Sequence, residues 1–129
     1  MGKVGSFEDL EIWRLAREIC QDIWLLIDTT KLGKDFESRN QMNGSSGSIM
    51  DNIAEGFERN GNKEFTQFLS ISKASCGELR SQLYRCWDRN HIEKDVFDKL
   101  AAKTKIEGRK IGAFMSYLKN SERRGSKYD

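Results

Sequence analysis

The stretch SIMDNIAEGF, residues 48–57, decides how this chain is expected to fold. A helix turns by about 100° per residue, so one line along its surface can carry apolar side chains while a neighbouring line carries polar ones. The apolar line holds Met42, Ile49, Ile53 and Phe57, and the polar line holds Gln41, Ser48, Asn52 and Glu55. A polar line beside a core line is typical of hydrogen bonds between packed helices. The stretch therefore predicts an amphipathic helix inside a helical domain and shows no catalytic constellation.

The composition favours long helices in one domain. The chain has 129 residues, no proline, 33% charged residues and 37% hydrophobic residues. Proline breaks helices and charged side chains solvate their outer faces, so both values suit long uninterrupted helices. The apolar content is too high for a disordered chain. We expect a single all-α domain over residues 1–129.

No stretch of the sequence predicts a membrane or secretion signal. The longest apolar run, Ile23–Ile27, is far shorter than the roughly 20 residues that span a bilayer. Residues 1–5 contain one lysine and no apolar segment, so the expected location is cytoplasmic. Because three widely spaced cysteines, Cys20, Cys76 and Cys86, accompany only one histidine, we expect free buried thiols, no metal site and no cofactor.

Four helical segments follow from the apolar spacing and the turn residues. We expect helices at about 6–29, 36–60, 63–90 and 93–123, followed by a flexible tail at 124–129. Short turns between long helices predict an antiparallel up-down-up-down four-helix bundle. The first helix has an apolar face wider than one partner requires, with Trp13 and Trp24 on nearly the same line, so it needs a second cover such as another subunit.

The second and fourth predicted helices each allow one more specific prediction. The run Asn43–Gly47 reads as a loop by propensity, but the lines before and after it stay in phase, which favours a continuous helix over a break. Its small residues are expected to face the small centre of the third helix, residues 72–77. The expected core line of the fourth helix holds Phe97, Leu100, Thr104, Gly108, Ile111, Met115 and Leu118.

Basic residues gather at the C-terminal end of the chain. Residues 94–129 carry 10 Lys and Arg against 5 Asp and Glu, whereas residues 1–93 carry 12 against 15. A basic helix on a near-neutral body can contact a phosphate backbone, and the alternative is a solvated helix face. The candidate nucleic-acid-binding residues are Lys99, Lys103, Arg109, Lys110, Arg123 and Arg124.

Residues for catalysis are missing from the pattern. The single histidine, His91, lies between two helices and fits a capping or surface role better than that of a general base. The Glu-x-x-His signature of di-iron bundles is absent, and residues 44–47 lack the lysine of a phosphate-binding loop. For the polar line we expect a structural role, with Arg59 pairing with Glu55 one turn away. We therefore expect no enzyme.

Several motifs together resemble a known family. They are F-x-D-L-x-x-W at residues 7–13, Gln41, S-I-x-x-N-I-A-E-G-F-x-R at residues 48–59, and E-F-x-x-F-L-x-I-x-x-x-S-x-x-E-L-x-x-Q-L at residues 64–83. This pattern resembles the bacterial four-helix bundle proteins first described as products of intervening sequences in large-subunit ribosomal RNA genes. It is also similar to the accessory variability determinant of diversity-generating retroelements. The fourth helix matches these proteins only in length and character.

The resemblance implies a homopentamer of four-helix bundles arranged as a barrel, and, for the retroelement relative, a basic pentamer that binds a reverse transcriptase and nucleic acid. Two departures weaken the case for nucleic-acid binding through the second helix. The family often carries a basic pair where Asn43 and Gly44 stand, and a proline where Met50 stands. Two functions remain open: a non-enzymatic oligomeric scaffold or accessory protein that binds RNA or DNA through a basic face, and a protein-interaction module without nucleic-acid binding.

Overall fold

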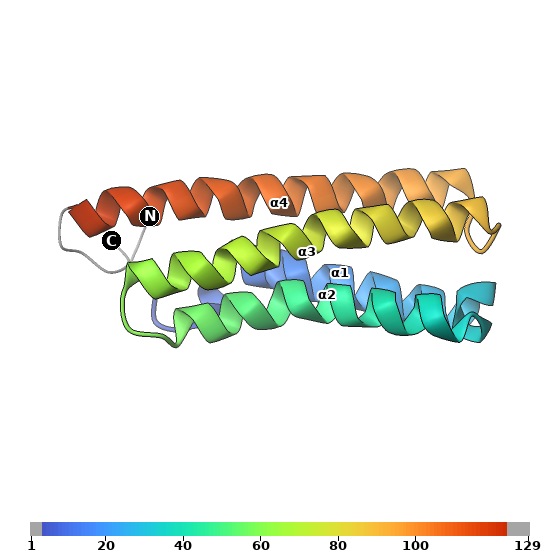
Figure 1. The fold of residues 1–129 in the computed structure, drawn as a ribbon, viewed down its shortest axis with the longest axis horizontal. Coiled ribbons are helices and arrows are strands. Elements are labelled where there is room, and N and C mark those ends of the chain that lie inside the picture. The colour runs from blue at the N-terminus through green and yellow to red at the C-terminus, as the bar shows by residue number, and fades with distance from the viewer. Residues whose placement is uncertain (1–3, 124–129) are drawn as a thin grey trace.

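The computed structural model describes residues 4–123 and the side chains of residues 4–121. Four long helices lie side by side along the length of the molecule (Figure 1). The elements are the 3₁₀ turn η1 (Phe7–Asp9), α1 (Glu11–Thr29), the 3₁₀ turn η2 (Lys31–Lys34), α2 (Phe36–Phe57), α3 (Asn62–Asp88) and α4 (Lys94–Arg123). No strand occurs in residues 4–123, and the predicted all-α class is confirmed. The predicted tail at 124–129 lies outside the described residues.

The first helix begins later than the sequence predicts. The carboxylate of Asp9 accepts the backbone N–H groups of Gly5 and Ser6, each at 3.2 Å, and closes the turn η1. Leu10 is then extended, with φ −79° and ψ 128°, so the chain cannot continue as a helix there. The prediction of one helix from residue 6 is therefore wrong, because this local capping arrangement forms a separate turn before α1.

The second helix runs without a break through Asn43–Gly47. A carboxylate oxygen of Asp35 caps it by accepting from Ser38 N–H at 3.4 Å. Within the run, the small side chain of Ser46 lets α1 approach closely, since the Cys20 thiol donates to the Ser46 carbonyl at 3.1 Å. Packing thus stabilises a segment that propensity alone marks as a loop. Beyond α2, Gly61 at φ +93° supplies the left-handed residue that turns the chain into α3.

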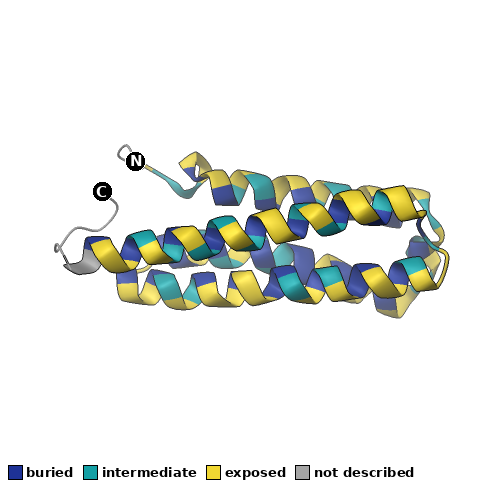
Figure 2. Cartoon of the chain, turned by 90° about the horizontal axis from the view of Figure 1, so that it is seen from above, coloured by how far each residue is buried: buried dark blue, intermediate teal, exposed yellow. Residues whose placement is uncertain are grey.

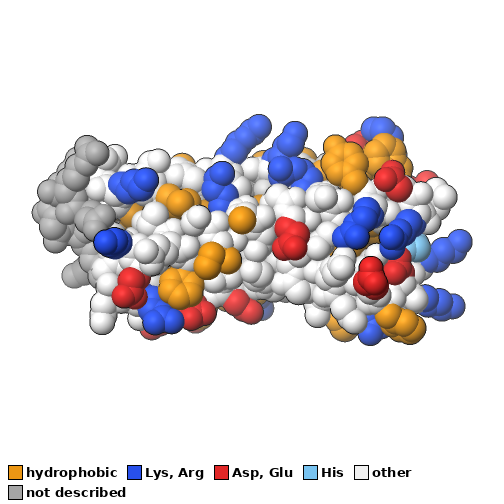
Figure 3. Space-filling view, in the orientation of Figure 1, with side chains coloured by type: hydrophobic (Ala, Val, Ile, Leu, Met, Phe, Trp, Pro, Cys, Tyr) orange, Lys and Arg blue, Asp and Glu red, His pale blue; other side chains and the backbone are white. Residues whose placement is uncertain are grey.

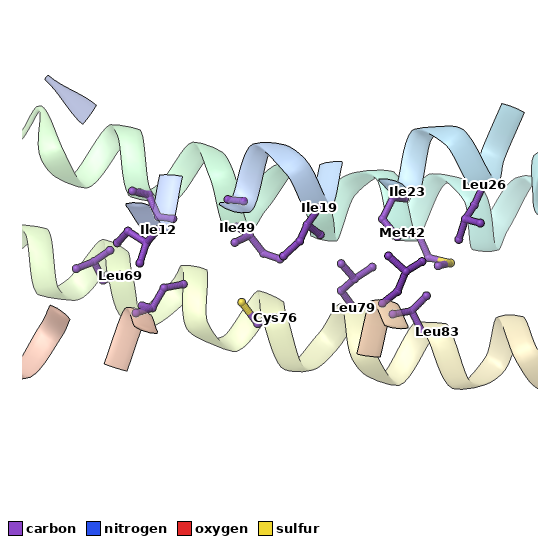
Figure 4. Packing of buried hydrophobic residues seen from close by; sticks show 14 of the residues in the cluster. Ile12, Ile19, Ile23, Leu26, Met42, Ile49, Leu69, Cys76, Leu79 and Leu83 are labelled. Carbon is purple, nitrogen blue, oxygen red and sulfur yellow. The ribbon is translucent and has the colours of Figure 1, made fainter. Parts of the chain in front are cut away.

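The core fills the space between the helices. Buried positions form inward-facing stripes, with exposed positions on the outer surfaces (Figure 2). Ile23 of α1, Met42 of α2 and Leu79 of α3 are fully buried and point toward one another (Figure 4). Burial of one such side chain stabilises the fold by about 1.5–3 kcal/mol.

The contact between α2 and α3 is close. A Cβ atom placed on Gly56 would lie 2.7 Å from Phe68 Cβ and 2.8 Å from Phe65 Cδ1. Two turns earlier the hydroxyls of Ser48 and Ser75 hydrogen-bond at 2.8 Å, and Ser72 Oγ donates to the Ile49 carbonyl at 2.7 Å. Small residues on both helices thus let the two backbones approach and exchange hydrogen bonds.

The inward face of α4 differs from the predicted core line. Gly108 and Met115 are half-buried, whereas Glu107 and Phe114 are buried. The ring of Phe114 packs against Phe65 of α3 with centroids 5.6 Å apart. The other five predicted residues, Phe97, Leu100, Thr104, Ile111 and Leu118, are buried, so the predicted line is confirmed there and is wrong only at Gly108 and Met115.

One apolar stripe of α1 faces outward. Trp13 is half-buried against Phe7, with ring centroids 5.1 Å apart, but Trp24 is 57% exposed and Leu25 is 60% exposed. Part of the wide apolar face predicted for this helix is thus left uncovered by its own chain. Among the helices of residues 4–123, none is both long and apolar enough to cross a bilayer.

Candidate nucleic-acid interface

Two of the six predicted nucleic-acid-binding residues make ion pairs within the molecule. The Lys103 ammonium contacts carboxylate oxygens of Asp22 at 2.6 Å and Glu18 at 2.5 Å, and Lys110 contacts Glu11 at 2.8 Å. Burial opposes the charge on Lys103, but its bonds to Asp22 and Glu18 outweigh that effect and raise its pKa. Both lysines thus link α4 to α1 and are not free to bind a phosphate.

Of the other four predicted residues, two are exposed and two have side chains outside the described part of the molecule. Lys99 and Arg109 are exposed and make no ion pair among the described side chains. The side chain of Arg123 and all of Arg124 lie outside the part of the molecule that the structure describes. Of the four predicted residues whose side chains the structure describes, only Lys99 and Arg109 therefore remain without an ion pair.

A different group of cations lies along the contact between α3 and α4. Lys73 of α3 reaches across this contact, since its Cε would lie 3.3 Å from a Cβ on Gly112 of α4. Arg80 lies two turns further along α3, and the charges of both residues act on Cys76 between them. Cys76 itself packs beside Gly108, which Lys105 and Arg109 flank on α4.

We call Lys73, Arg80, Lys105 and Arg109 the basic strip. Lys and Arg side chains spread over α3 and α4 on the face shown in Figure 3. None of the four makes an ion pair among the residues that the structure describes. The sequence pattern did not predict the part of the strip formed by Lys73, Arg80 and Lys105, because these residues belong to two different helices. The spacing of seven residues between Lys73 and Arg80, which places both on one side of a helix, was a signal that could have been used.

Acidic side chains are nearly absent from this region. Between Phe65 and Trp87 the only acidic residue is Glu78, and between Lys99 and Ser121 it is Glu107. Glu78 lines a hollow on the α2 side of α3, and Glu107 is buried. The exposed carboxylate of these two segments is that of Glu78, which lies on the α2 side of α3, so the basic strip keeps a net positive field.

An exposed aromatic side chain follows the basic strip on α3. Tyr84 is 51% exposed and packs one side of its ring against Phe97, at a centroid distance of 4.6 Å. It lies one turn beyond Arg80, on the same side of α3. Aromatic rings next to cations are typical of surfaces that bind single-stranded nucleic acid, because bases stack on the rings.

The predicted polar line is only partly in the interior. Ser48 bonds to Ser75 of α3, and Asn52 donates back to the Ser48 carbonyl at 2.8 Å and to its hydroxyl at 3.0 Å. Glu55 and Arg59 instead pair with each other at 2.9 Å on the surface. Both residues are exposed, so the expectation of an interior location fails for them.

Gln41, the first member of the polar line, lies at the surface. Its amide oxygen accepts from Arg85 of α3 at 2.7 Å, across a polar hollow of about 500 Å³. The hollow is lined in part by small residues, which are Gly44 and Ser48 of α2 and Ser81 of α3. The Gln41–Arg85 bond and the Ser48–Ser75 bond join the same two helices, but the first is exposed to solvent.

His91 takes part in a structural cluster at the end of the molecule. Its Nε2 lies 2.9 Å from a carboxylate oxygen of Asp35, to which Arg89 also donates at 2.9 Å. The hydrogen bonds from His91 and then Arg89 hold the pKa of Asp35 well below its usual range. This arrangement ties the start of α2 to the connection between α3 and α4 and holds no nucleophile.

Within the described part of the chain, the thiols and acidic groups do not form a metal site. No cluster of three or more His, Cys, Asp or Glu side chains suited to a metal ion occurs among the described residues. All three cysteines are free; Cys76 and Cys86 are buried and Cys20 is half-buried. Burial raises the pKa of Cys76 to about 12 and that of Cys86 to about 11, so neither is a reactive thiolate at neutral pH.

Four long helices, a closely packed α2–α3 contact and a basic strip define an all-α protein whose notable surface is cationic. The chain belongs to the 23S rRNA-intervening sequence protein family, whose model matches residues 8–113. This match confirms the resemblance of the motifs at residues 7–83 to the intervening-sequence proteins and extends it over most of α4, whereas the similarity to the retroelement determinant stays a prediction. A search of curated proteins gave no match.

Proposed function

We propose that the protein is a non-enzymatic scaffold or accessory protein of the cytoplasm that binds RNA or DNA through the basic strip. The observation that carries this proposal is the set of four cations, Lys73, Arg80, Lys105 and Arg109, which have no acidic partner among the described residues. Membership of a family named for insertions in ribosomal RNA genes makes RNA the first ligand to test. Tyr84 offers a ring on which a base can stack, which favours single-stranded segments.

The test measures the affinity for a single-stranded RNA at several salt concentrations. Changing Lys73, Arg80, Lys105 and Arg109 to Gln removes up to four phosphate contacts per subunit. The slope of log K against log salt should then become shallower by about 3, since each contact on a single strand contributes about 0.7. The control changes four other basic residues to Gln: Arg17, Lys31, Lys34 and Lys63, all exposed.

The control has the same net charge as the first variant, so equal salt slopes in the two variants would show that binding follows net charge alone. A salt slope that the strip variant leaves at the wild-type value would remove the proposal. Tyr84→Ala should weaken binding about 5- to 100-fold, with little change in the slope, if a base stacks on the ring.

We also propose that the protein assembles into a homopentamer, as the resemblance implies. The exposed Trp24 and Leu25 on α1 support self-association, because large apolar side chains side by side on a surface mark interfaces. Sedimentation velocity should give the mass of five chains of 14.9 kDa. Trp24→Ser should shift the protein to smaller species, whereas Ile71→Ser on α3, where the isoleucine is also half-exposed, should not.

A protein-interaction module is the second candidate, with a reverse transcriptase as one partner that the resemblance suggests. The same apolar surface of α1 favours it, since a heterologous partner can cover Trp24 and Leu25 as well as another subunit can. A specific protein that stays bound after nuclease treatment and is lost in Trp24→Ser would support this function. A protein retained by Trp24→Ser would place the interaction elsewhere.

A further inference from the structure

The most unusual buried group of the molecule is Glu107. It is fully buried, and neither of its carboxylate oxygens has a hydrogen-bond partner among the described residues. An unpaired ionised carboxylate in a protein interior costs several kcal/mol, so the packed form holds this group neutral. Burial is the main cause that raises the pKa of Glu107 to about 8, with a smaller contribution from the charge of Glu11.

One cation acts on Glu107: the charge of Lys110 lowers the pKa of the acid, but by less than burial raises it. On α1 the charged group that acts on Glu107 is Glu11, and on α3 Glu107 acts on the neutral thiol of Cys76, which Arg80 and Lys73 also influence. On α4 itself the nearest cation is Lys110, one turn away. Within residues 4–123, α2 contributes no ionisable group that acts on Glu107.

Lys110 is already engaged with another partner. Its ammonium contacts the Glu11 carboxylate at 2.8 Å and so bridges α4 to α1. Because Lys110 follows Glu107 by three residues, it can instead reach Glu107 along its own helix. The two carboxylates therefore compete for one cation, and only the bond to Glu11 holds two helices together.

The contact between α1 and α4 is also less extensive than the contacts α1–α2, α2–α3 and α3–α4. Two mainly apolar hollows of about 310 and 340 Å³ lie along it, one beside Phe114 and Tyr117 and the other beside Leu25 and Leu100. Between them the two helices are joined by the ion pairs of Lys103 and Lys110. By contrast, α2 has its broad contacts with α3, and α3 with α4.

We propose that the α1–α4 contact is a proton-operated latch. When Glu107 loses its proton to solvent, Lys110 moves from Glu11 to Glu107 and α1 separates from α4, while α2, α3 and α4 stay packed. In the closed form Glu107 is neutral and the Lys110–Glu11 bridge is intact. The separation supplies water to the new carboxylate and exposes the apolar faces that line the two hollows.

The sign of the pH effect follows from linkage. A carboxyl group that is harder to ionise in the closed form than in the open form favours closure at low pH, and this contribution is lost as the pH rises. The open population should grow about tenfold per pH unit between about 5 and 8 and level off above 8, where the closed form also ionises.

Hydrogen exchange of the whole chain at pH 6 to 9, corrected for the intrinsic exchange rate, tests this latch. In the wild type the protection of the α1 amides against exchange should fall about tenfold per pH unit up to about pH 8, because the open population grows by that factor. The protection of the α2 and α3 amides should not change with pH. Glu107→Gln keeps the shape and cannot ionise, so its α1 amides should lose this pH dependence. Lys110→Met removes the bridge, so α1 should open more often even at pH 6.

Three outcomes would overturn the latch. The first is an equal pH dependence of α1 in the wild type and in Glu107→Gln. The second is α2 and α3 amides that follow α1 at every pH, which would mean that ionisation unfolds the whole domain. The third outcome applies if Glu107→Gln does not fold. Infrared spectra of the wild type are then compared with those of Lys110→Met between pH 6 and 9. A wild-type spectrum that loses no carboxylic acid band over this range would overturn the latch.

Discussion

The α2–α3 and α1–α4 contacts solve the same packing problem in opposite ways. Between α2 and α3, small residues bring the backbones close from Ser48 to Gly56, and short neutral hydrogen bonds such as Ser48–Ser75 at 2.8 Å fix the register. The polar hollow of about 500 Å³ between these helices lies toward Gln41 and Arg85. Between α1 and α4, long charged side chains bridge a contact with two hollows and a buried Glu107. The strength of neutral hydrogen bonds in a close contact does not depend on pH or salt. The strength of ion pairs depends on salt, and a buried ionisable group beside them adds a dependence on pH. We therefore expect the first contact to be permanent and the second to be adjustable.

The largest loss of stability is expected at the centre of the close contacts. Phe65 is fully buried and its ring packs against both Phe57 and Phe114, at centroid distances of 6.0 and 5.6 Å. Phe65→Ala should lower the free energy of unfolding by about 3–5 kcal/mol, as measured by urea denaturation. Phe36→Ala, which truncates a 63% exposed ring, should change it by less than about 1 kcal/mol.

The next largest effect is a gain in stability at the open contact. Glu107→Met replaces the buried acid with an apolar side chain of similar length and should raise the free energy of unfolding by about 2 kcal/mol at pH 8. The gain should shrink as the pH falls toward 4.5, where the wild-type group is neutral both folded and unfolded. Glu78→Met, at an exposed position, is the control and should show no such pH dependence. A gain that is constant from pH 5 to 8 would contradict the assignment of a buried neutral acid.

Glycine substitutions on α2 sharpen the comparison further. Gly56→Ala adds a Cβ that would lie within 2.8 Å of two phenylalanine side chains, so it should cost about 1–3 kcal/mol despite the better helix propensity of alanine. Gly44→Ala adds a Cβ with no neighbour within 4 Å and should stabilise the protein by about 0.5–1 kcal/mol. Equal changes in melting temperature for the two variants would mean that the backbones are not in close contact at Gly56.

The smallest effect is expected for an ion pair of the open contact. Lys103→Met removes the bonds to Glu18 and Asp22 and should cost about 1 kcal/mol at low salt, and less in 1 M salt. Lys94→Met removes the exposed pair with Asp98 within α4 and should cost less than about 0.5 kcal/mol. The two variants are compared by thermal unfolding at both salt concentrations. A Lys103→Met penalty that does not change with salt would assign its role to packing of the lysine stem.

Much of the fold is predictable because the pattern repeats. The apolar line from Met42 to Phe57 stays in phase across the glycines, and α2 is continuous as that phase requires. The serines of α3 were expected to meet the small residues of α2, and Ser75 does so. Local arrangements were less predictable: η1 forms because Asp9 accepts two backbone N–H groups, and neighbouring residues decide that arrangement.

The surface was harder to predict than the core. Lys103 and Lys110 read as free cations because their partners on α1 lie 81 to 99 residues away in the sequence. For the same reason, the basic strip is visible only when α3 and α4 are placed side by side. Glu107 was missed because sequence patterns assign acidic residues to the solvent side, and only packing shows an exception.

The order in which these contacts can form is a consequence of their sequence separation. The Ser48–Ser75 bond closes a segment of 27 residues, whereas the Lys103–Glu18 pair joins residues 85 positions apart. During synthesis at about 5–20 residues per second, Glu18 therefore waits about 4–17 seconds for its partner to be made. In that interval α1 has only α2 and α3 as helical partners within its own chain, and its α4-facing side is open to any apolar surface nearby. The last contact to form is thus also the one at which an outside molecule can intervene during folding.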